Sequence, residues 1–153
     1  MRKPDGAILL TGGAGFIGSH TLDALVKAGE RVVVLDDFND YYDPKFKEGN
    51  VAHHRDNPKV KIIKGSVTDL ELLKKLFNEN HFGAVIHLAA RAGVRASITD
   101  PLLYQKVNVE GTTNLLEMCR QNKVPRFIFA SSSSVYGNQT KTPFSETDSV
   151  DRP

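Results

Sequence analysis

Short apolar runs alternate with longer amphipathic stretches along most of this chain. Five runs rich in Val, Ile, Leu, Ala and Phe have the length and composition of buried strands, namely residues 7–11, 31–36, 60–64, 84–88 and 126–131. Apolar residues recur at helical spacing between them, in residues 16–28, 69–80 and 101–122. Asp69 is a candidate cap for the second of these helices. Residues 37–57 are polar, so we expect a long loop there with room for one short helix.

This alternation predicts an α/β protein. Strands that are separated by amphipathic helices form a parallel sheet with helices on both faces, because each right-handed crossover places its helix over the sheet. The predicted architecture is the doubly wound Rossmann fold, in which ligands bind at the carboxyl ends of the strands. A chain of 153 residues suits one domain, and we expect residues 1–153 to form it.

Composition and charge narrow the function classes. The formal net charge of +2 gives no reason to expect a nucleic acid or an anionic membrane as partner. The apolar runs are too short to span a bilayer, and the first residues lack the longer apolar core of a signal peptide. Cys119 is the one cysteine of the sequence, which excludes an intrachain disulfide and favours a reducing compartment. We therefore expect a cytoplasmic protein.

The strongest local motif is the sequence TGGAGFIG at residues 11–18, between the first predicted strand and the first helix. Its glycines permit a tight turn, close approach of a pyrophosphate to the backbone, and close packing of helix on strand. The following helix would direct its free N–H groups at the phosphates. Asp36 ends the second strand, where an acid can bind the adenosine ribose. With Asp37 beside it, this position favours NAD over NADP; a purely structural glycine turn is the alternative.

The glycine spacing and four further motifs resemble the extended short-chain dehydrogenase/reductase family, and within it the NAD-dependent nucleotide-sugar epimerases and dehydratases. The further motifs are DDFNDYYDP at 36–44, HLAARAGVRASI at 87–98, DPLLYQKVNVEGTTNLLE at 100–117 and SSSSVYGN at 131–138. The combination of DDFNDYYDP with AARAGVR is most similar to UDP-glucuronate 4-epimerases. This resemblance extends over nearly the whole chain.

The resemblance implies NAD as cofactor and assigns a set of binding residues. Residues of the glycine motif would border the pyrophosphate, residues after the second and third strands would hold the ribose and the adenine, and residues after the fourth strand would border the nicotinamide. An asparagine of the long helix would lie nearby. In this order the candidates are Gly12, Gly15, Phe16, Ile17, Gly18, Asp36, Asp37, Asn39, Ser66, Val67, Leu88, Ala89, Ala90, Arg91 and Asn108.

The resemblance also implies where catalysis occurs. Ser132 stands at the family position that shares the substrate's C4 hydroxyl with the catalytic tyrosine, and Ser133, Ser134, Arg91 and Arg95 are candidates for holding the sugar or its carboxylate. The serine run read by itself favours a loop cap instead. The family's catalytic Y-x-x-x-K motif is missing. Tyr41 and Lys45 have its spacing, but Pro44 stands between them, so we reject the pair. We expect the chain to be truncated before this motif and the substrate-binding part.

The expected activity of the intact enzyme is C4 epimerisation of a UDP-sugar through a 4-keto intermediate, from UDP-glucuronate to UDP-galacturonate. We expect the 153 residues alone to be inactive, and relatives suggest a homodimer through the long helices. A nucleotide-sugar 4,6-dehydratase or decarboxylase is one alternative, although a dehydratase usually has Asp-Glu where this chain has two serines. A non-catalytic NAD-sensing domain is the other alternative.

Three histidines are possible site residues. His53 and His54 stand in the polar loop without a cysteine or paired carboxylates at ligand spacing, so we expect solvated side chains and no metal site. His87 ends the fourth predicted strand, where a packed, hydrogen-bonded histidine is favoured over a role beside the cofactor.

Overall fold

The computed structural model describes residues 6–151 and shows one parallel sheet of five strands. The sequence predicts no signal peptide at the N-terminus. Residues 1–5 of that segment lie outside the described residues. The strand order β3-β2-β1-β4-β5 is that of the Rossmann fold, which confirms the predicted fold class. The strands are β1 (Ala7–Thr11), β2 (Val32–Asp36), β3 (Val60–Lys64), β4 (Phe82–His87) and β5 (Phe127–Phe129).

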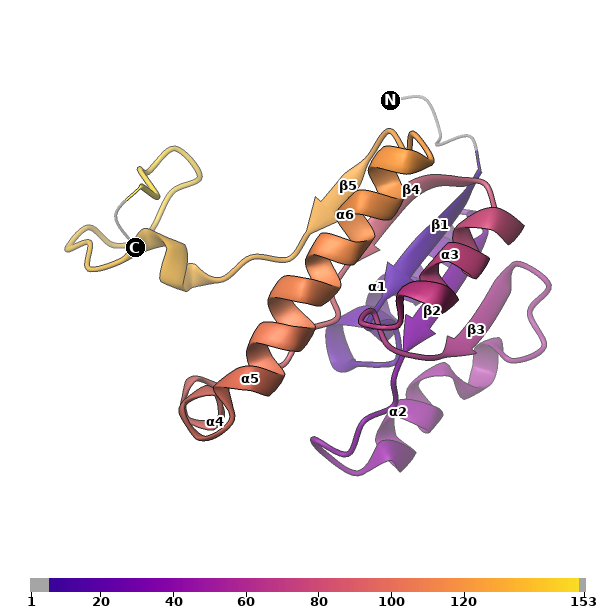
Figure 1. The fold of residues 1–153 in the computed structure, drawn as a ribbon, viewed down its shortest axis with the longest axis horizontal. Coiled ribbons are helices and arrows are strands. Elements are labelled where there is room, and N and C mark those ends of the chain that lie inside the picture. The colour runs from indigo at the N-terminus through magenta and orange to yellow at the C-terminus, as the bar shows by residue number, and fades with distance from the viewer. Residues whose placement is uncertain (1–5, 152–153) are drawn as a thin grey trace.

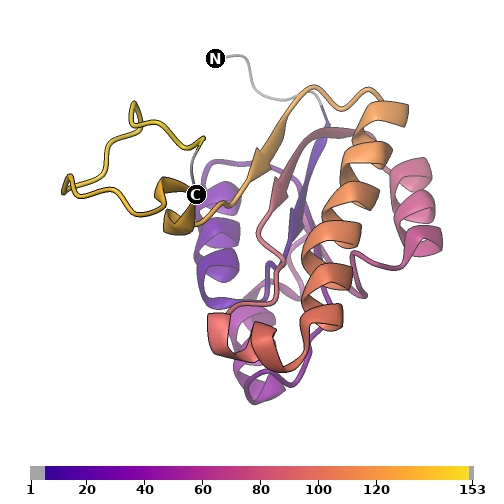
Figure 2. The ribbon, with the colours of Figure 1, turned by 60° about the vertical axis from the view of Figure 1, so that its left-hand side comes forward.

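Helices cover both faces of this sheet (Figures 1 and 2). On one face, α1 (Phe16–Lys27) and α2 (Pro44–Val51) cover a core that includes Leu10, Leu22 and Val34. On the other face, α3 (Leu70–Glu79) and α6 (Gly111–Gln121) cover a larger core with Leu9, Val33, Leu73, Leu115 and Cys119. Neighbouring strand residues such as Leu9 and Leu10 enter opposite cores because side chains alternate along a strand.

Side-chain caps explain where two of the helices begin. Asp69 accepts a hydrogen bond from the Leu72 N–H at 3.0 Å, which confirms it as the cap of α3. Asp43 accepts from the Lys45 N–H at the start of α2, and Pro44 occupies the first turn. Helix α1 differs, because its first residue follows Gly15 and no side chain caps it. Its first N–H groups therefore have no side-chain partner at the edge of the sheet.

The predicted helix at 101–122 is continuous but not uniformly α-helical. It consists of α5 (Pro101–Tyr104), a π-helical segment (Gln105–Glu110) and α6. A further short helix, α4 (Val94–Thr99), precedes it and was not predicted, because it is shorter than two turns. The prediction for the fifth strand was too long, since β5 covers only Phe127–Phe129. A one-turn insertion of π-helix frequently accompanies a functional site.

Beyond β5, the described chain leaves the sheet as an arm that extends away from the helices (Figure 1). Its regular structure in residues 130–151 is a short 3₁₀ helix, Ser133–Tyr136. Among residues 6–151, none of the helices is long and apolar enough to cross a membrane.

Candidate functional site

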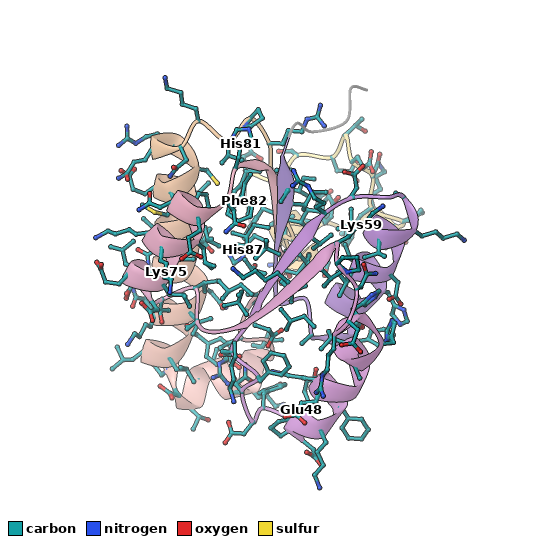
Figure 3. All side chains as sticks on the ribbon, turned by 90° about the vertical axis from the view of Figure 1, so that its right-hand side faces the viewer. Glu48, Lys59, Lys75, His81, Phe82 and His87 are labelled. Carbon is teal, nitrogen blue, oxygen red and sulfur yellow. The ribbon has the colours of Figure 1, made fainter. Side chains whose placement is uncertain are left out.

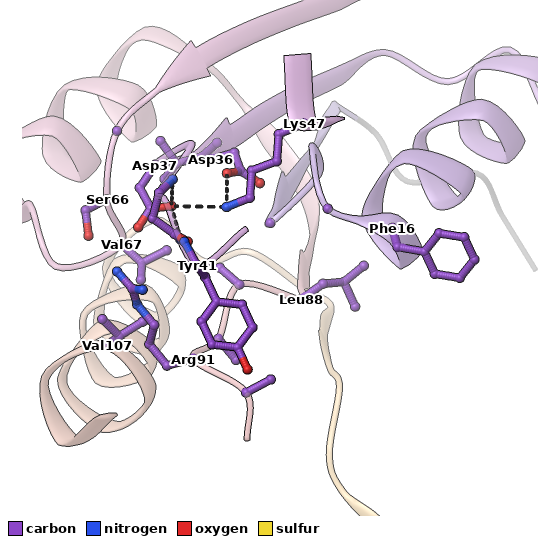
Figure 4. Close-up of a pocket in the computed structure, with 18 of the residues that line it drawn as sticks. Phe16, Asp36, Asp37, Tyr41, Lys47, Ser66, Val67, Leu88, Arg91 and Val107 are labelled. Carbon is purple, nitrogen blue, oxygen red and sulfur yellow. Dashed lines mark hydrogen bonds and ion pairs between the residues drawn. The ribbon is translucent and has the colours of Figure 1, made fainter. Parts of the chain in front are cut away.

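A cavity of about 260 Å³ opens at the carboxyl ends of the strands, where the Rossmann fold binds its ligands. The glycine turn after β1, the ends of β2 and β3, and the segment after β4 meet around it (Figure 4). Most of the predicted cofactor residues line it: Gly12, Gly15, Phe16, Asp36, Asp37, Asn39, Ser66, Val67, Leu88, Ala89, Ala90 and Arg91.

The three glycines of the motif meet different constraints. Gly12 has a φ of +69°, and a Cβ there would lie 2.7 Å from the Ala89 nitrogen. A Cβ on Gly18 would overlap the Gly12 carbonyl oxygen, so this glycine lets α1 pack on the turn. Gly15 has an ordinary φ of −71°, and its Cβ would meet only the Gly12 oxygen, at 3.3 Å. Gly12 and Gly18 are therefore required by the fold, whereas Gly15 keeps the cavity open.

Asp36 is buried at the end of β2 and joins the glycine turn to the next loop. Its carboxylate accepts hydrogen bonds from the Ala14 N–H at 3.0 Å and the Phe38 N–H at 2.9 Å. Burial raises the pKa of Asp36, while these hydrogen bonds and the charge of Lys47 act in the opposite direction. A carboxylate has about four lone-pair sites, so two acceptor positions remain after these bonds.

Lys47 is the most informative cavity residue that the sequence analysis missed. It lies on α2 with 5% of its surface exposed, and its ammonium is 3.9 Å from Asp36 and 4.0 Å from Asp37 (Figure 4). The same ammonium lies 5.1 Å from the ring centre of Tyr42, which is a cation–π geometry. The sequence did contain a signal for Lys47: Asp43 and Pro44 are typical of a helix start, which places Lys47 on the first turn of a helix. Other cavity residues that were missed include Tyr41, Gly65, Ala92 and Val107.

On the opposite side of the cavity, the segment after β4 is held by the long helix. The Asn108 side chain accepts from the Arg91 N–H at 2.8 Å and donates to the Arg91 carbonyl at 3.0 Å. Tyr104 donates from its hydroxyl to the Ala92 carbonyl. Asn108 is not among the residues that line the cavity; its amide oxygen and nitrogen both position the Arg91 backbone. The Arg91 Nε is buried and has no hydrogen-bond partner among the described residues.

The structure does not bring the remaining candidates to the cavity. Ile17 is 68% exposed on α1, and Arg95 is exposed on α4. Ser132, Ser133 and Ser134 are exposed on the arm beyond β5. The Ser132 hydroxyl accepts from the Ser134 N–H at 3.2 Å and caps the 3₁₀ helix, which is the cap arrangement that the serine run by itself favours.

His87 is buried and centres a hydrogen-bond network; Figure 3 labels it among the side chains on the sheet. Its Nδ1 is 2.6 Å from the Thr11 hydroxyl, and its Nε2 is 3.0 Å from the Thr112 hydroxyl. Thr112 donates its proton to the Asn108 carbonyl, so it accepts from the His87 Nε2–H, and Thr11 donates to Nδ1. The packed histidine that the sequence favoured is confirmed. This neutral imidazole joins β1, β4 and the helix that holds Arg91.

We expect acidification from pH 7 to pH 5 to cost about 2 kcal/mol of stability through His87 alone. Burial lowers the pKa of His87 from 6.5 to about 4. Below pH 6.5, His87 is therefore protonated in the unfolded chain, whereas in the folded chain it stays neutral down to about pH 4. The free energy of unfolding falls across this pH range. Urea unfolding of wild type and His87→Gln at both pH values measures the effect. Equal losses in the two proteins would contradict the buried neutral histidine.

Comparisons with known proteins place this geometry in a family. Residues 9–152 match the family described as GDP-mannose 4,6 dehydratase, and the chain belongs to this family. It is 48% identical to UDP-glucuronate 4-epimerase 4 of Arabidopsis thaliana over 147 residues, which are 95% of this chain and 33% of that protein. The chain thus spans about a third of the length of the curated relatives of this kind. The resemblance predicted from the motifs is confirmed.

Solved structures agree with this assignment. The UDP-Glc/GlcNAc 4-epimerase from Campylobacter jejuni is 35% identical with a TM-score of 0.82, over 97% of this chain and 44% of that chain. UDP-glucose-4-epimerase from Stenotrophomonas maltophila, solved with bound NAD and formylated UDP-arabinopyranose, is 32% identical with a TM-score of 0.81, over 95% of this chain and 42% of that chain.

Proposed function

We propose that this chain binds NAD in the cavity at the carboxyl edge of the sheet. The observation that carries the proposal is the pairing of an uncapped helix start at Gly15 with the buried Asp36 carboxylate across one cavity. Three local features fit a dinucleotide. Gly15 leaves room where a side chain would intrude, Asp36 retains acceptor positions for ribose hydroxyls, and the buried Arg91 Nε has no hydrogen-bond partner within residues 6–151.

Each of these groups suits one part of the cofactor. The N–H groups of the glycine turn and of α1 suit the pyrophosphate, and the Asp36 carboxylate suits the adenosine ribose. Ser66 and Val67 border the adenine end, and Leu88–Arg91 border the nicotinamide end, where small side chains allow close approach. Related epimerases solved with NAD support NAD as the ligand of this cavity.

We further propose that residues 1–153 are the NAD-binding part of a longer enzyme that interconverts UDP-glucuronate and UDP-galacturonate. The relatives named UDP-glucuronate 4-epimerase support the substrate, and the shared fold of UDP-sugar 4-epimerases supports the reaction. When bound, NAD supplies a reversible hydride acceptor for C4 of the sugar. The residues of this chain hold and orient that acceptor, and Ser132 is the proposed partner of the C4 hydroxyl.

The full-length polypeptide tests this proposal when it is incubated with UDP-glucuronate and, separately, UDP-glucose, with the products resolved by NMR. We expect UDP-galacturonate from the first substrate without net reduction of NAD. A 4-keto-6-deoxy sugar would instead support the dehydratase that the family description names. Binding of NAD without any sugar conversion would support an NAD-sensing domain.

A homodimer through the long helices is also proposed. Large apolar side chains are exposed on α4, α5, the π-helical segment and α6, and exposed apolar residues that gather in a patch mark an interaction site. The residues are Val94, Ile98, Leu102, Val109 and Leu116.

The cavity should discriminate against NADP. A 2′-phosphate at the ribose would face Asp36 and Asp37, whose two charges the single ammonium of Lys47 balances only in part. We expect NAD to bind more tightly than NADP in calorimetry, and Asp36→Ala to weaken NAD binding by about 1.5–3 kcal/mol, the typical loss for hydrogen bonds to a charged group.

The control is Glu48→Ala, which removes an exposed carboxylate of α2 that does not line the cavity. It should leave both affinities unchanged. Asp36→Ala also frees the Ala14 and Phe38 N–H groups, so unfolding curves must show that the variant is folded at the titration temperature. NADP binding equal to or tighter than NAD binding would overturn the ribose role of Asp36.

A further inference from the structure

Three possible metal ligands converge on the side of the molecule formed by α1 and the turn after α2. Asp23 lies on α1, and His53 and His54 lie on the short 3₁₀ helix Ala52–His54. One oxygen of Asp23, Oδ1, is 2.9 Å from the Nε2 of His53 and 2.7 Å from the Nε2 of His54. All three ligand atoms lie within 4.8 Å of one another. None of these residues lines the cavity described above.

The polar sequence around the two histidines predicts solvated side chains, and this prediction is wrong for His54, which is 6% exposed. The prediction did not include Asp23, the carboxylate that both histidines contact, which lies 30 residues before His53. Spacing along the chain cannot reveal it, because the turn after α2 folds back against α1. His54 is a buried anchor, whereas the side chains of Asp23 and His53 are 46% and 58% exposed and have room to adjust.

The donor set has the chemistry of a transition-metal site. Two imidazoles and one carboxylate suit zinc, copper or nickel, and catalytic zinc sites use three protein ligands with one open position. Zinc binds such ligands at about 2.0–2.2 Å, which places tetrahedral donor atoms roughly 3.3 Å apart. The two Asp23–histidine separations of 2.7 and 2.9 Å are shorter than this, and all three donor atoms lie within 4.8 Å of one another. The exposed side chains of Asp23 and His53 would have to adjust to reach tetrahedral spacing.

The geometry points to a divalent zinc-type site formed by Asp23, His53 and His54, separate from the dinucleotide cavity. In the free protein, the imidazoles share the Asp23 oxygen through hydrogen bonds. Each neutral imidazole exposes its Nε2 lone pair when its proton resides on Nδ1. The bound ion would connect α1 to the end of the segment that carries Asn39 and Lys47.

Zinc titration of the metal-free protein, followed by calorimetry, tests the site. We expect one zinc ion per chain. Asp23→Asn keeps a hydrogen-bond acceptor but loses the charged ligand, and His53→Gln changes an exposed ligand without opening the core. Each substitution should weaken the affinity for zinc by about tenfold or more. His20→Gln, on α1 but outside the cluster, is the matched control and should bind zinc as the wild type does.

A second measurement distinguishes this site from weak binding elsewhere. Cobalt(II) in place of zinc should give the visible absorption of a four- or five-coordinate ion with wild type and His20→Gln, and not with Asp23→Asn. Zinc should also raise the unfolding temperature of the wild type more than that of Asp23→Asn, because a ligand bound to the folded state stabilises it. Absence of saturable zinc binding, or equal binding by wild type, Asp23→Asn and His53→Gln, would overturn the proposal and leave the cluster as a hydrogen-bonded tie between α1 and the turn.

Discussion

Valine at position 15 is expected to abolish NAD binding while the protein stays folded. The Gly15 backbone already has a φ that any residue adopts, and an added Cβ meets only one oxygen, at 3.3 Å. The side chain would therefore extend into the cavity, where the pyrophosphate must approach the backbone. We expect the affinity to fall by more than about a hundredfold, or roughly 2.7 kcal/mol. Calorimetry measures the binding, and circular dichroism measures the fold.

Gly18→Val is the matched control: it changes a glycine of the same motif, but we expect it to impair folding rather than NAD binding. A Cβ at position 18 overlaps the backbone of the glycine turn, and overpacking typically costs about 1–3 kcal/mol and occasionally more. We expect this variant to lose stability first and NAD only as a consequence. A folded Gly15→Val protein that keeps its affinity for NAD would contradict the assignment of the turn to the pyrophosphate.

Residues 1–153 alone are expected to bind NAD but to convert no detectable UDP-glucuronate. The sequence contains no tyrosine and lysine one turn apart on a helix: α2 begins at Pro44, so Tyr41 lies outside the helix that contains Lys45. General acid–base assistance supplies a factor of about 10²–10⁴, and substrate positioning adds a further large factor. Ser132 is exposed on the arm and cannot replace these groups.

The assay incubates the 153-residue chain with saturating NAD and UDP-glucuronate, and follows UDP-galacturonate by NMR. The full-length polypeptide under the same conditions is the positive control. Conversion by the 153 residues at a rate similar to that of the full-length polypeptide would contradict both the inactivity of the fragment and the role of the missing tyrosine and lysine.

Local signals in the sequence were sufficient to predict most of the fold. The strands at 7–11 and 60–64 begin and end at the predicted residues. The first is a fully buried apolar run, as is typical of a central parallel strand. The second lies at the edge of the sheet and was recognisable from its β-branched residues. Asp69 was identifiable as a cap because its role depends on a residue only three positions away. The glycine turn and Asp36 were predictable for a similar reason: both stand at the carboxyl ends of strands, which the parallel topology brings to one edge.

The parts that the sequence could not reveal depend on contacts between distant segments. Lys47 reaches Asp36 and Asp37 only because α2 folds back over the end of β2. Asp23 meets His53 and His54 through the packing of α1 against the turn after α2. Asn108 was expected near the cofactor from its motif, and the structure shows that its amide accepts one hydrogen bond from the Arg91 backbone and donates one to it. Side-chain direction, which spacing alone does not specify, decides each of these cases.

Calorimetric titration of NAD into the 153-residue protein tests the central claim most directly. The account predicts saturable binding of one NAD per chain, with weaker binding of NADP measured in the same buffer. Binding should disappear in Gly15→Val and persist in Glu48→Ala. Absence of NAD binding by the folded wild-type chain would contradict the assignment of the cavity, and with it the proposed role of this chain in a nucleotide-sugar epimerase.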